Sequence, residues 1–285
     1  MKYTYAILGG TGHIGSALAL LLIRQGHSVL VIGHNEEQQK KWTALGAGFQ
    51  AVEITDSERL KTLLNQGERL FILNPPADPA KDAEVEELKY IERISKAIEG
   101  LRPKKIVMAS TYGARKGKGL FDLSTLYELE QELKQNRAPL AIIRSAYYMS
   151  NLDLPAKMAA ESGKLTTVLP ADFKLPMVAP ADIAGLAAKL LQDDRTGTYY
   201  VQAKEEYSAR DAAKVLSNIL HRDITPDEIP EGRWAAYMQE NGFSERSTES
   251  FIGMTKLTIE EKFEPADPQI GETTLEQYLK GIQFS

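Results

Sequence analysis

Residues 9–15, close to the start of the chain, read GGTGHIG, with glycine at the first, fourth and seventh positions. Residues 3–8 before them predict a short buried β-strand, and residues 14–25 carry apolar side chains at helical spacing. A tight turn between a strand and a helix brings a helix N-terminus to the edge of a sheet. The free N–H groups and the helix dipole at that point attract phosphate. The stretch therefore predicts a phosphate-binding turn.

Each of the three glycines has a separate role in such a turn. Gly9 lets the chain reverse, Gly12 lets the backbone approach a phosphate with no Cβ in between, and Gly15 lets the helix lie close to the strand. The spacing is GxxGxxG and not the GxGxxG of the common dinucleotide motif. It resembles the extended spacing of atypical and extended short-chain dehydrogenases. We expect dinucleotide binding; a purely structural turn is the alternative.

The rest of the first half of the chain alternates between predicted strands and predicted helices. Further strands are predicted at residues 29–32, 49–54, 70–73, 105–109 and 140–143, and helices at 36–45, 57–64, 84–98 and 124–135. Alternation of this kind is typical of an α/β fold with a doubly wound parallel sheet of Rossmann type. We expect residues 1–150 to form an NAD(P)-binding Rossmann domain. Residues 151–285 are expected to form a smaller C-terminal α+β substrate-binding lobe, with some segments returning to the main sheet.

The composition of the 285 residues excludes several classes of protein. The net charge of -5 argues against nucleic-acid binding. Cysteine is absent, and the four histidines do not have the spacing of metal ligands. No apolar run reaches the roughly 18 residues typical of a membrane span, and the first apolar run is a strand, not part of a signal peptide. We expect a cytoplasmic protein with a small-molecule substrate and no nucleic-acid, membrane or metal partner; the oligomeric state is left open.

Residues that follow the predicted strands indicate where the cofactor lies. The expected contacts are Gly9, Thr11, Gly12, His13, Ile14, His34, Asn35, Asp56, Asn74, Pro75, Pro76 and Ser110. The second strand ends in Gly33-His34-Asn35, without the acid that binds the ribose 2′-hydroxyl of NAD. We therefore expect NADP(H) in preference to NAD(H), with His34 and Asn35 near the 2′-phosphate. Asp56 is expected to contact the adenine or to cap the N-terminus of the next helix, and both roles are compatible. Asn74-Pro75-Pro76 either lies beside the cofactor or only ends a strand.

Other segments continue this pattern along nearly the whole chain. They are ITDSERL, LNPP, KIVMASTYGA, ELEQELKQNRAPLAIIRSAYYMSNL, MVAPADIAGLAAKLL and YSARDAAKVLSNILHRDI, followed by Trp234 and TTLEQYL. With GGTGHIG, their order and spacing resemble the NmrA-like family of the atypical short-chain dehydrogenases. The resemblance implies a Rossmann-type domain, a small C-terminal substrate lobe and a cleft between them. The family includes NAD(P)H-dependent reductases of quinones, dyes and other conjugated compounds, and redox-sensing regulators that bind the dinucleotide without turnover.

The Tyr-x-x-x-Lys proton relay usual in short-chain dehydrogenases is missing from the helix after the fifth strand. Residues 112–116 and 200–204 match the Tyr-x-x-x-Lys pattern, but the first match begins in a predicted loop and the second in a predicted strand. On the helix itself, alignment on Glu130 places Asp122 at the tyrosine position and Leu126 at the lysine position. The catalytic residues are therefore left unassigned, and ordinary alcohol–ketone chemistry is disfavoured.

These observations predict an NAD(P)H-dependent reductase of a small conjugated substrate such as a quinone. Hydride would pass directly between two rings held in contact, and the proton would come from water. Tyr112 and Tyr148, after the fifth and sixth strands, are the expected substrate contacts, with core packing as the alternative for each. A non-catalytic NADP(H) redox-sensing regulatory protein is the alternative function. A sugar- or lipid-modifying dehydrogenase is a third, disfavoured by the missing relay.

Overall fold

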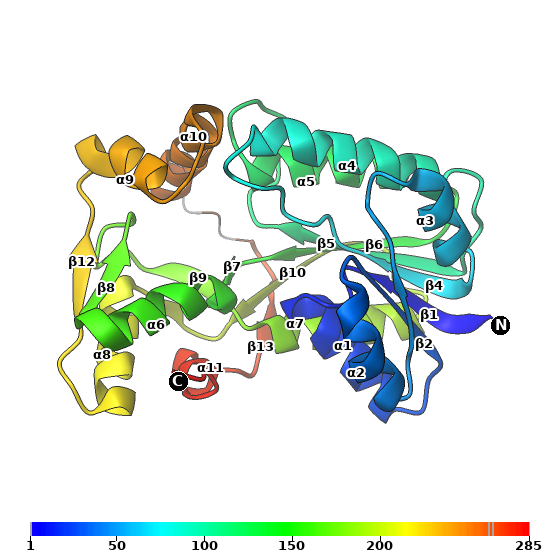
Figure 1. Ribbon diagram of the computed structural model, residues 1–285, viewed down its shortest axis with the longest axis horizontal. Coiled ribbons are helices and arrows are strands. Elements are labelled where there is room, and N and C mark those ends of the chain that lie inside the picture. The colour runs from blue at the N-terminus through cyan, green and yellow to red at the C-terminus, as the bar shows by residue number, and fades with distance from the viewer. Residues whose placement is uncertain (1, 262, 264, 285) are drawn as a thin grey trace.

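A parallel sheet of eight strands lies at the centre of the computed structural model, which describes residues 2–261, 263 and 265–284 (Figure 1). Its strands are β1 (Tyr3–Leu8), β2 (Val29–Gly33), β3 (Gly48–Ala51), β4 (Gly67–Ile72), β5 (Lys105–Thr111), β6 (Leu140–Ser145), β10 (Gly197–Ala203) and β13 (Gln269–Gly271). They pair in the order β13-β10-β6-β5-β4-β1-β2-β3. The chain order reverses between β1 and β4, and open α/β sheets bind ligands at the carboxyl edge of such a reversal. The expected fold class is confirmed.

Helices cover both faces of this sheet (Figure 1). One face carries α3 (Ser57–Leu64), α4 (Ala83–Ile98) and α5 (Asp122–Lys134), and the other carries α1 (His13–Arg24), α2 (Gln39–Ala44) and α7 (Pro180–Gln192). Successive residues of a strand point to opposite faces, so Ile7 enters the core under α1 and α7 while Leu8 enters the core under α3 and α4. Both faces are apolar, as a parallel sheet requires. No helix of the described residues is long and apolar enough to cross a membrane.

The later part of the chain forms a C-terminal lobe with its own core. Its strands are β7 (Tyr147–Tyr148), β8 (Lys164–Thr167), β9 (Leu175–Val178), β11 (Glu206–Tyr207) and β12 (Thr225–Glu228). Its helices are α6 (Asp153–Ser162), α8 (Ala209–Leu220), α9 (Trp234–Glu240), α10 (Glu245–Glu261) and α11 (Leu275–Lys280), with short 3₁₀ turns η2 (Met149–Leu152) and η3 (Glu231–Arg233). Three later elements, α7, β10 and β13, belong to the main sheet and its helix layer. A domain boundary at residue 150 stays a prediction.

One carboxylate, that of Glu84 on α4, connects the lobe to the main sheet layer. Ser250 on α10 donates to Glu84 Oε2 at 2.9 Å, and the Gly119 N–H donates to both carboxylate oxygens at 3.1 and 3.0 Å. Ser124 on α5 donates to Oε1 at 3.2 Å. In the same contact, Ser247 on α10 donates to the carbonyl of Lys81 at 2.7 Å. Because these donors satisfy the carboxylate, Glu84 fixes α10 and the loop before α5 against α4.

Among the predicted elements whose bounds differ from the observed ones, two differ for a physical reason that the structure shows. The helix predicted at residues 36–45 is divided into η1 (Glu36–Gln38) and α2, because Asn35 caps a short first turn by accepting the N–H of Glu37 at 2.9 Å. The strand predicted at residues 49–54 ends at Ala51 because its only neighbour, β2, ends at Gly33, the residue paired with Ala51.

The close approach of α1 to β1 gives a test of the fold. A Cβ on Gly15 would lie 2.2 Å from the Gly9 carbonyl oxygen, whereas a Cβ on Gly185 in α7 would meet nothing within 4 Å. We expect Gly15→Ala to lower the free energy of unfolding by about 1–3 kcal/mol through overpacking. Gly185→Ala is the matched control, expected to stabilise by about 0.5–1 kcal/mol. Urea unfolding of both variants measures the difference, and equal midpoints would contradict the close contact.

Candidate functional site

The turn between β1 and α1 presents backbone N–H groups at the carboxyl edge of the sheet. Gly9 has a φ of 74°, in the left-handed region, and its carbonyl accepts the N–H of Gly12 at 3.1 Å. The helix begins at His13, and Gly12 provides no side-chain cap. The first-turn N–H groups, among them those of His13 and Ile14, therefore remain for a ligand, and the positive end of the helix dipole lies at the same point.

Gly12 shows that this turn fits a bound phosphate. Its φ of -79° and ψ of 178° suit any residue, and an added Cβ would meet only the Gly9 carbonyl oxygen, at 3.5 Å. The fold therefore does not require glycine at this position, in contrast to Gly15. A Cβ here would instead fill the space beside the free N–H groups. The residues present thus fit the diphosphate of a dinucleotide.

The end of β2 carries no acidic side chain. Gly33 lies against Thr11, since a Cβ on Gly33 would be 2.7 Å from the Thr11 methyl carbon. His34 follows and is exposed. The Asn35 side chain accepts the N–H of Glu37 at 2.9 Å and donates to the Glu37 carboxylate at 3.3 Å. Of the two expected 2′-phosphate contacts, the Asn35 side chain is therefore already held by capping η1, whereas the His34 side chain is exposed.

Two further predicted residues follow β3 and β4. Asp56 Oδ1 accepts the N–H of Arg59 at 3.0 Å, so the N-cap reading is confirmed and the adenine contact stays a prediction. Asn74 is only 8% exposed, and its Oδ1 has no hydrogen-bond partner among the described residues. A buried oxygen without a donor is costly, which favours a ligand group beside it. Pro75 is half-buried and Pro76 exposed.

The structure places the Ser110 hydroxyl inside a buried ionic cluster. Ser110 donates to Glu130 Oε1 at 2.6 Å. Arg144 binds the same carboxylate through two hydrogen bonds, of 2.9 and 2.8 Å. Ser110 and Glu130 are fully buried. The cluster therefore holds α5 against β5 and β6, and a cofactor contact by Ser110 stays a prediction.

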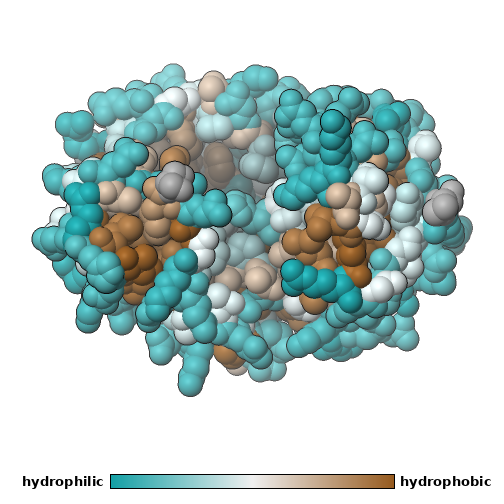
Figure 2. All heavy atoms as spheres, turned by 60° about the horizontal axis from the view of Figure 1, so that its bottom comes forward, coloured by the Kyte–Doolittle hydropathy of each residue, from teal (hydrophilic) through white to brown (hydrophobic). Residues whose placement is uncertain are grey.

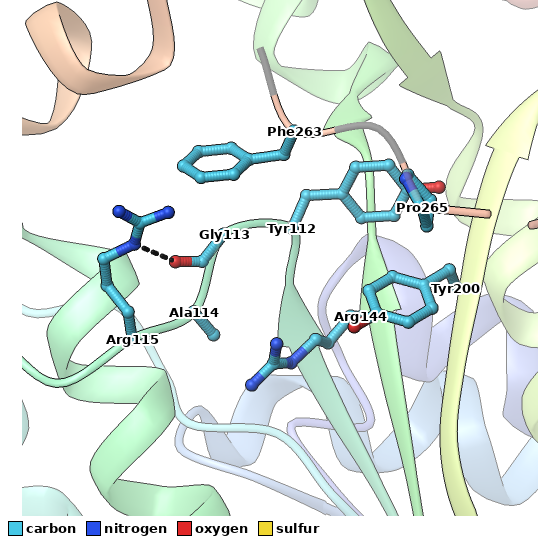
Figure 3. Close-up of a pocket in the computed structure, with 8 residues that line it drawn as sticks. All are labelled: Tyr112, Gly113, Ala114, Arg115, Arg144, Tyr200, Phe263 and Pro265. Atoms are coloured by element: carbon cyan, nitrogen blue, oxygen red, sulfur yellow. Dashed lines mark hydrogen bonds between the residues drawn. The ribbon is translucent and has the colours of Figure 1, made fainter. Parts of the chain in front are cut away.

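The two predicted substrate tyrosines lie in different surroundings. Tyr112 lines a cavity of about 440 Å³ together with Gly113, Ala114, Arg115, Arg144, Tyr200, Phe263 and Pro265 (Figure 3). Its hydroxyl donates to Gln202 at 3.0 Å, and its ring meets that of Tyr200 edge-on at 5.6 Å. Tyr148 is half-buried on β7 and does not line this cavity. Burial raises the pKa of both phenols. The structure therefore does not bring the two tyrosines together in this cavity.

Neither candidate for the tyrosine–lysine relay lies on a helix. Residues 112–116 follow β5, with Gly113 at a φ of 70°, and Tyr200 lies within β10. The first residue of α5 is Asp122, two residues before the start of the helix predicted at residues 124–135, and its placement at the tyrosine position of the relay stays a prediction.

Sequence reasoning missed a buried acid next to Asp122. In the helix predicted at residues 84–98, the apolar side chains of Val85 and Leu88 are 43% and 39% exposed, while the acid Glu87 is 3% exposed. Thr125 donates to Glu87 Oε2 at 2.7 Å. Burial, with the Asp122 charge adding, raises the pKa of Glu87 to about 8, and burial raises that of Asp122 to about 6. The signal was available: Glu87 lies one turn before Ile91, which is buried.

A second cavity, of about 580 Å³, adjoins the N-termini of α1 and α7. His13, Asp153, Lys157, Pro180 and Tyr278 are among the residues that line it. Tyr278 donates to Asp153 Oδ1 at 2.7 Å, and His13 Nε2 lies 3.8 Å from Asp153 Oδ2. Figure 2 shows the surface hollowed between the two halves of the molecule. Lys157, which the sequence reasoning also missed, places a positive charge in the wall of this cavity.

The described ranges contain no group of three or more His, Cys, Asp or Glu side chains able to hold a metal ion.

A parallel sheet with a glycine turn at its order reversal is a Rossmann-type α/β structure. Residues 1–283 match the model of the NmrA-like family, and the chain belongs to this family. No curated protein matches the chain.

Three solved structures share the fold at low sequence identity. The triphenylmethane reductase of Citrobacter sp., solved with NADP(H), is 15% identical, with a TM-score of 0.80 over 97% of this chain and 99% of that one. The NADPH-dependent quinone oxidoreductase of Escherichia coli, solved with NADPH, is 19% identical, with a TM-score of 0.71 over 96% and 98%. A nucleoside-diphosphate-sugar epimerase of Staphylococcus aureus is 16% identical, with a TM-score of 0.75 over 98% and 100%.

Gly12 gives a test that separates ligand binding from folding. We expect Gly12→Val to abolish dinucleotide binding, because its side chain fills the space beside the first-turn N–H groups, and to leave the urea unfolding midpoint nearly unchanged. Calorimetric titration and urea unfolding of the same preparation measure both effects. Unchanged nucleotide affinity would contradict the phosphate site, and a large loss of stability would contradict the open space at Gly12.

Proposed function

We propose that the chain is an NADP(H)-dependent reductase of a small conjugated substrate such as a quinone. The observation that carries this proposal is the open turn at Gly12, where the fold does not need glycine but a bound diphosphate does. Two of the compared structures, the quinone oxidoreductase and the triphenylmethane reductase, support it because both were solved with the NADP cofactor. A cytoplasmic location and the absence of nucleic-acid binding remain expectations.

Each part of the proposed site has a simple physical role. The N–H groups of His13 and Ile14 would hold the diphosphate, and Lys157 would add a positive charge. Asn74 would donate through its amide or accept through its unpartnered oxygen at the loop after β4. The bound nicotinamide would supply the hydride. The lobe would place the acceptor ring against it and exclude water, which is catalysis by proximity.

We propose NADP(H) over NAD(H) because no acid at the end of β2 repels a 2′-phosphate. His34 is exposed directly after that strand, so an aspartate there would place a negative charge near the phosphate. We expect His34→Asp to shift the NADPH/NADH affinity ratio toward NADH by roughly tenfold, about 1.4 kcal/mol. His221→Asp is the control, because His221 is an exposed histidine after α8 and its replacement changes the charge in the same way. An affinity ratio unchanged by His34→Asp would remove His34 from the site.

The function itself is tested by calorimetric titration with NADPH, NADP, NADH and NAD, followed by turnover with simple quinones. We expect tight binding of NADPH and its oxidation when a quinone is added. Tight binding without turnover would favour a redox-sensing regulatory protein instead. Binding of none of the four nucleotides would contradict the proposal as a whole.

A further inference from the structure

Glu87 and Asp122 form a pair of carboxyl groups between α4 and α5. Thr125 Oγ1 donates to Glu87 Oε2 at 2.7 Å, and the N–H of Ala77 donates to Oε1 at 3.3 Å. Asp122 lies three residues before Thr125, and side chains at this spacing share one face of a helix. The Asp122 side chain therefore lies on the face of α5 from which Thr125 reaches Glu87, and its charge helps to raise the pKa of Glu87.

Two residues that are expected to contact the cofactor or the substrate lie near this pair. Ala77 belongs to the segment after β4 that also holds Asn74, whose buried Oδ1 has no partner in the described part of the chain. Tyr148 on β7 is near enough to Asp122 for the carboxylate charge to act on its phenol. The loop after β4, the start of α5 and β7 all lie at the carboxyl edge of the sheet, where ligands bind.

The two acids differ in how they are held. Glu87 is enclosed, at 3% exposure, with both carboxyl oxygens hydrogen-bonded. Asp122 is half-buried, burial raises the pKa of its carboxyl, and no hydrogen bond reaches that carboxyl from the residues the structure describes. Phe121 just before it has a φ of 47°, a left-handed backbone that turns the chain into α5. Asp122 is therefore the member of the pair that is able to reach a ligand.

We infer that Asp122 and Glu87 supply the proton of the reduction, with Asp122 delivering it to the substrate and Glu87 holding it in reserve. This inference rests on the proposed function. A quinone that accepts hydride from NADPH becomes a hydroquinone monoanion. The Asp122 O–H bond then breaks as a new O–H bond forms on the anionic oxygen of this monoanion. The products are NADP⁺, hydroquinone and an ionised Asp122. Glu87 and then solvent return the proton to Asp122.

The surrounding charges support a shared proton. The charges that raise the pKa of Glu87 are those of Asp122 and Glu84, in addition to burial, and the Tyr148 phenol faces Asp122 from β7. Two acids that repel each other in a desolvated site titrate as a pair and keep one proton to higher pH. The pair is therefore suited to supply a proton near neutral pH, because the best general acid has a pKa near the working pH.

Two classes of hydride acceptor differ in whether they also need a proton. A quinone needs both hydride and a proton. A cationic triphenylmethane dye needs hydride alone, because addition of hydride to the carbocation gives a neutral product. Loss of the acid pair should therefore slow quinone reduction and spare dye reduction, whereas a merely structural defect would slow both.

The test uses Asp122→Asn and Glu87→Gln, with Glu92→Gln, an exposed acid on α4, as the matched control. Glutamine retains oxygen and nitrogen atoms at the positions that meet Thr125 and Ala77. We expect Asp122→Asn to lower kcat with 1,4-benzoquinone roughly 10²-fold at neutral pH, within the range for loss of a general acid. Glu87→Gln should move the pH profile of kcat to lower pH. NADPH affinity by calorimetry and kcat with crystal violet should stay within about twofold in both variants, since hydride transfer alone is retained.

A second measurement does not depend on turnover. Infrared spectroscopy at neutral pH should show a protonated carboxyl band in the wild type that disappears in Glu87→Gln and persists in Glu92→Gln. The stability of the wild type should also fall relative to Glu87→Gln as pH rises from about 5 to about 8. Over that interval the folded state keeps a proton on Glu87 that the unfolded chain has released, so each rise in pH favours unfolding.

The outcomes separate the two proposals. Wild-type turnover with unchanged quinone rates in Asp122→Asn and Glu87→Gln would overturn the proton role and leave the reductase intact. A wild type that binds NADPH and reduces no acceptor would overturn the reductase and the proton role with it. Equal losses with quinone and dye would also overturn the proton role, because they would show a structural defect.

Discussion

The contact between the first turn of α1 and the end of β1 is the constraint on which the rest of this structure depends. The backbones approach so closely that a Cβ on Gly15 would lie 2.2 Å from the Gly9 carbonyl oxygen. This contact places the N-terminus of α1 at the point where the strand order reverses. The first-turn N–H groups, the end of β2 and the loop after β4 are brought to one edge because of it. Gly12, by contrast, is a glycine that the packing does not need and the proposed phosphate site does.

Four buried or half-buried acids near α5 differ in function because they differ in partners. Glu130 binds Arg144 twice and accepts the Ser110 hydroxyl, and Glu84 receives donors from the Gly119 backbone, α5 and α10. Carboxylates whose oxygens are hydrogen-bonded from several elements hold those elements together. Glu87 has two neutral donors and no cation, and Asp122 has no donor in the ranges described. The same chemical group is therefore structural in one pair and able to release or accept a proton in the other.

The sequence was enough to locate the elements that depend on local pattern. The bounds of β1 and α3 are those predicted, and the fold class follows from the alternation of strands and helices. What it could not supply depends on contacts far apart in the chain. The length of β3 is set by the end of β2, and the role of Tyr112 by Gln202 on β10. Glu87 was missed because an acid is expected on the exposed face of a helix, whereas this acid is buried by contacts with the segment after β4 and with α5.

The absence of a tyrosine–lysine relay on α5 suits an acceptor that is activated already. A ketone needs strong polarisation of its carbonyl as hydride arrives, which an acidified phenol provides. A conjugated ring accepts hydride more readily and spreads the charge over its atoms, so the remaining need is a proton delivered afterwards. A carboxyl pair whose pKa is raised by burial meets that need without a cation beside it. The position of Asp122 at the start of α5, where its charge acts on the Tyr148 phenol, would place such an acid at the proposed site of the product oxygen.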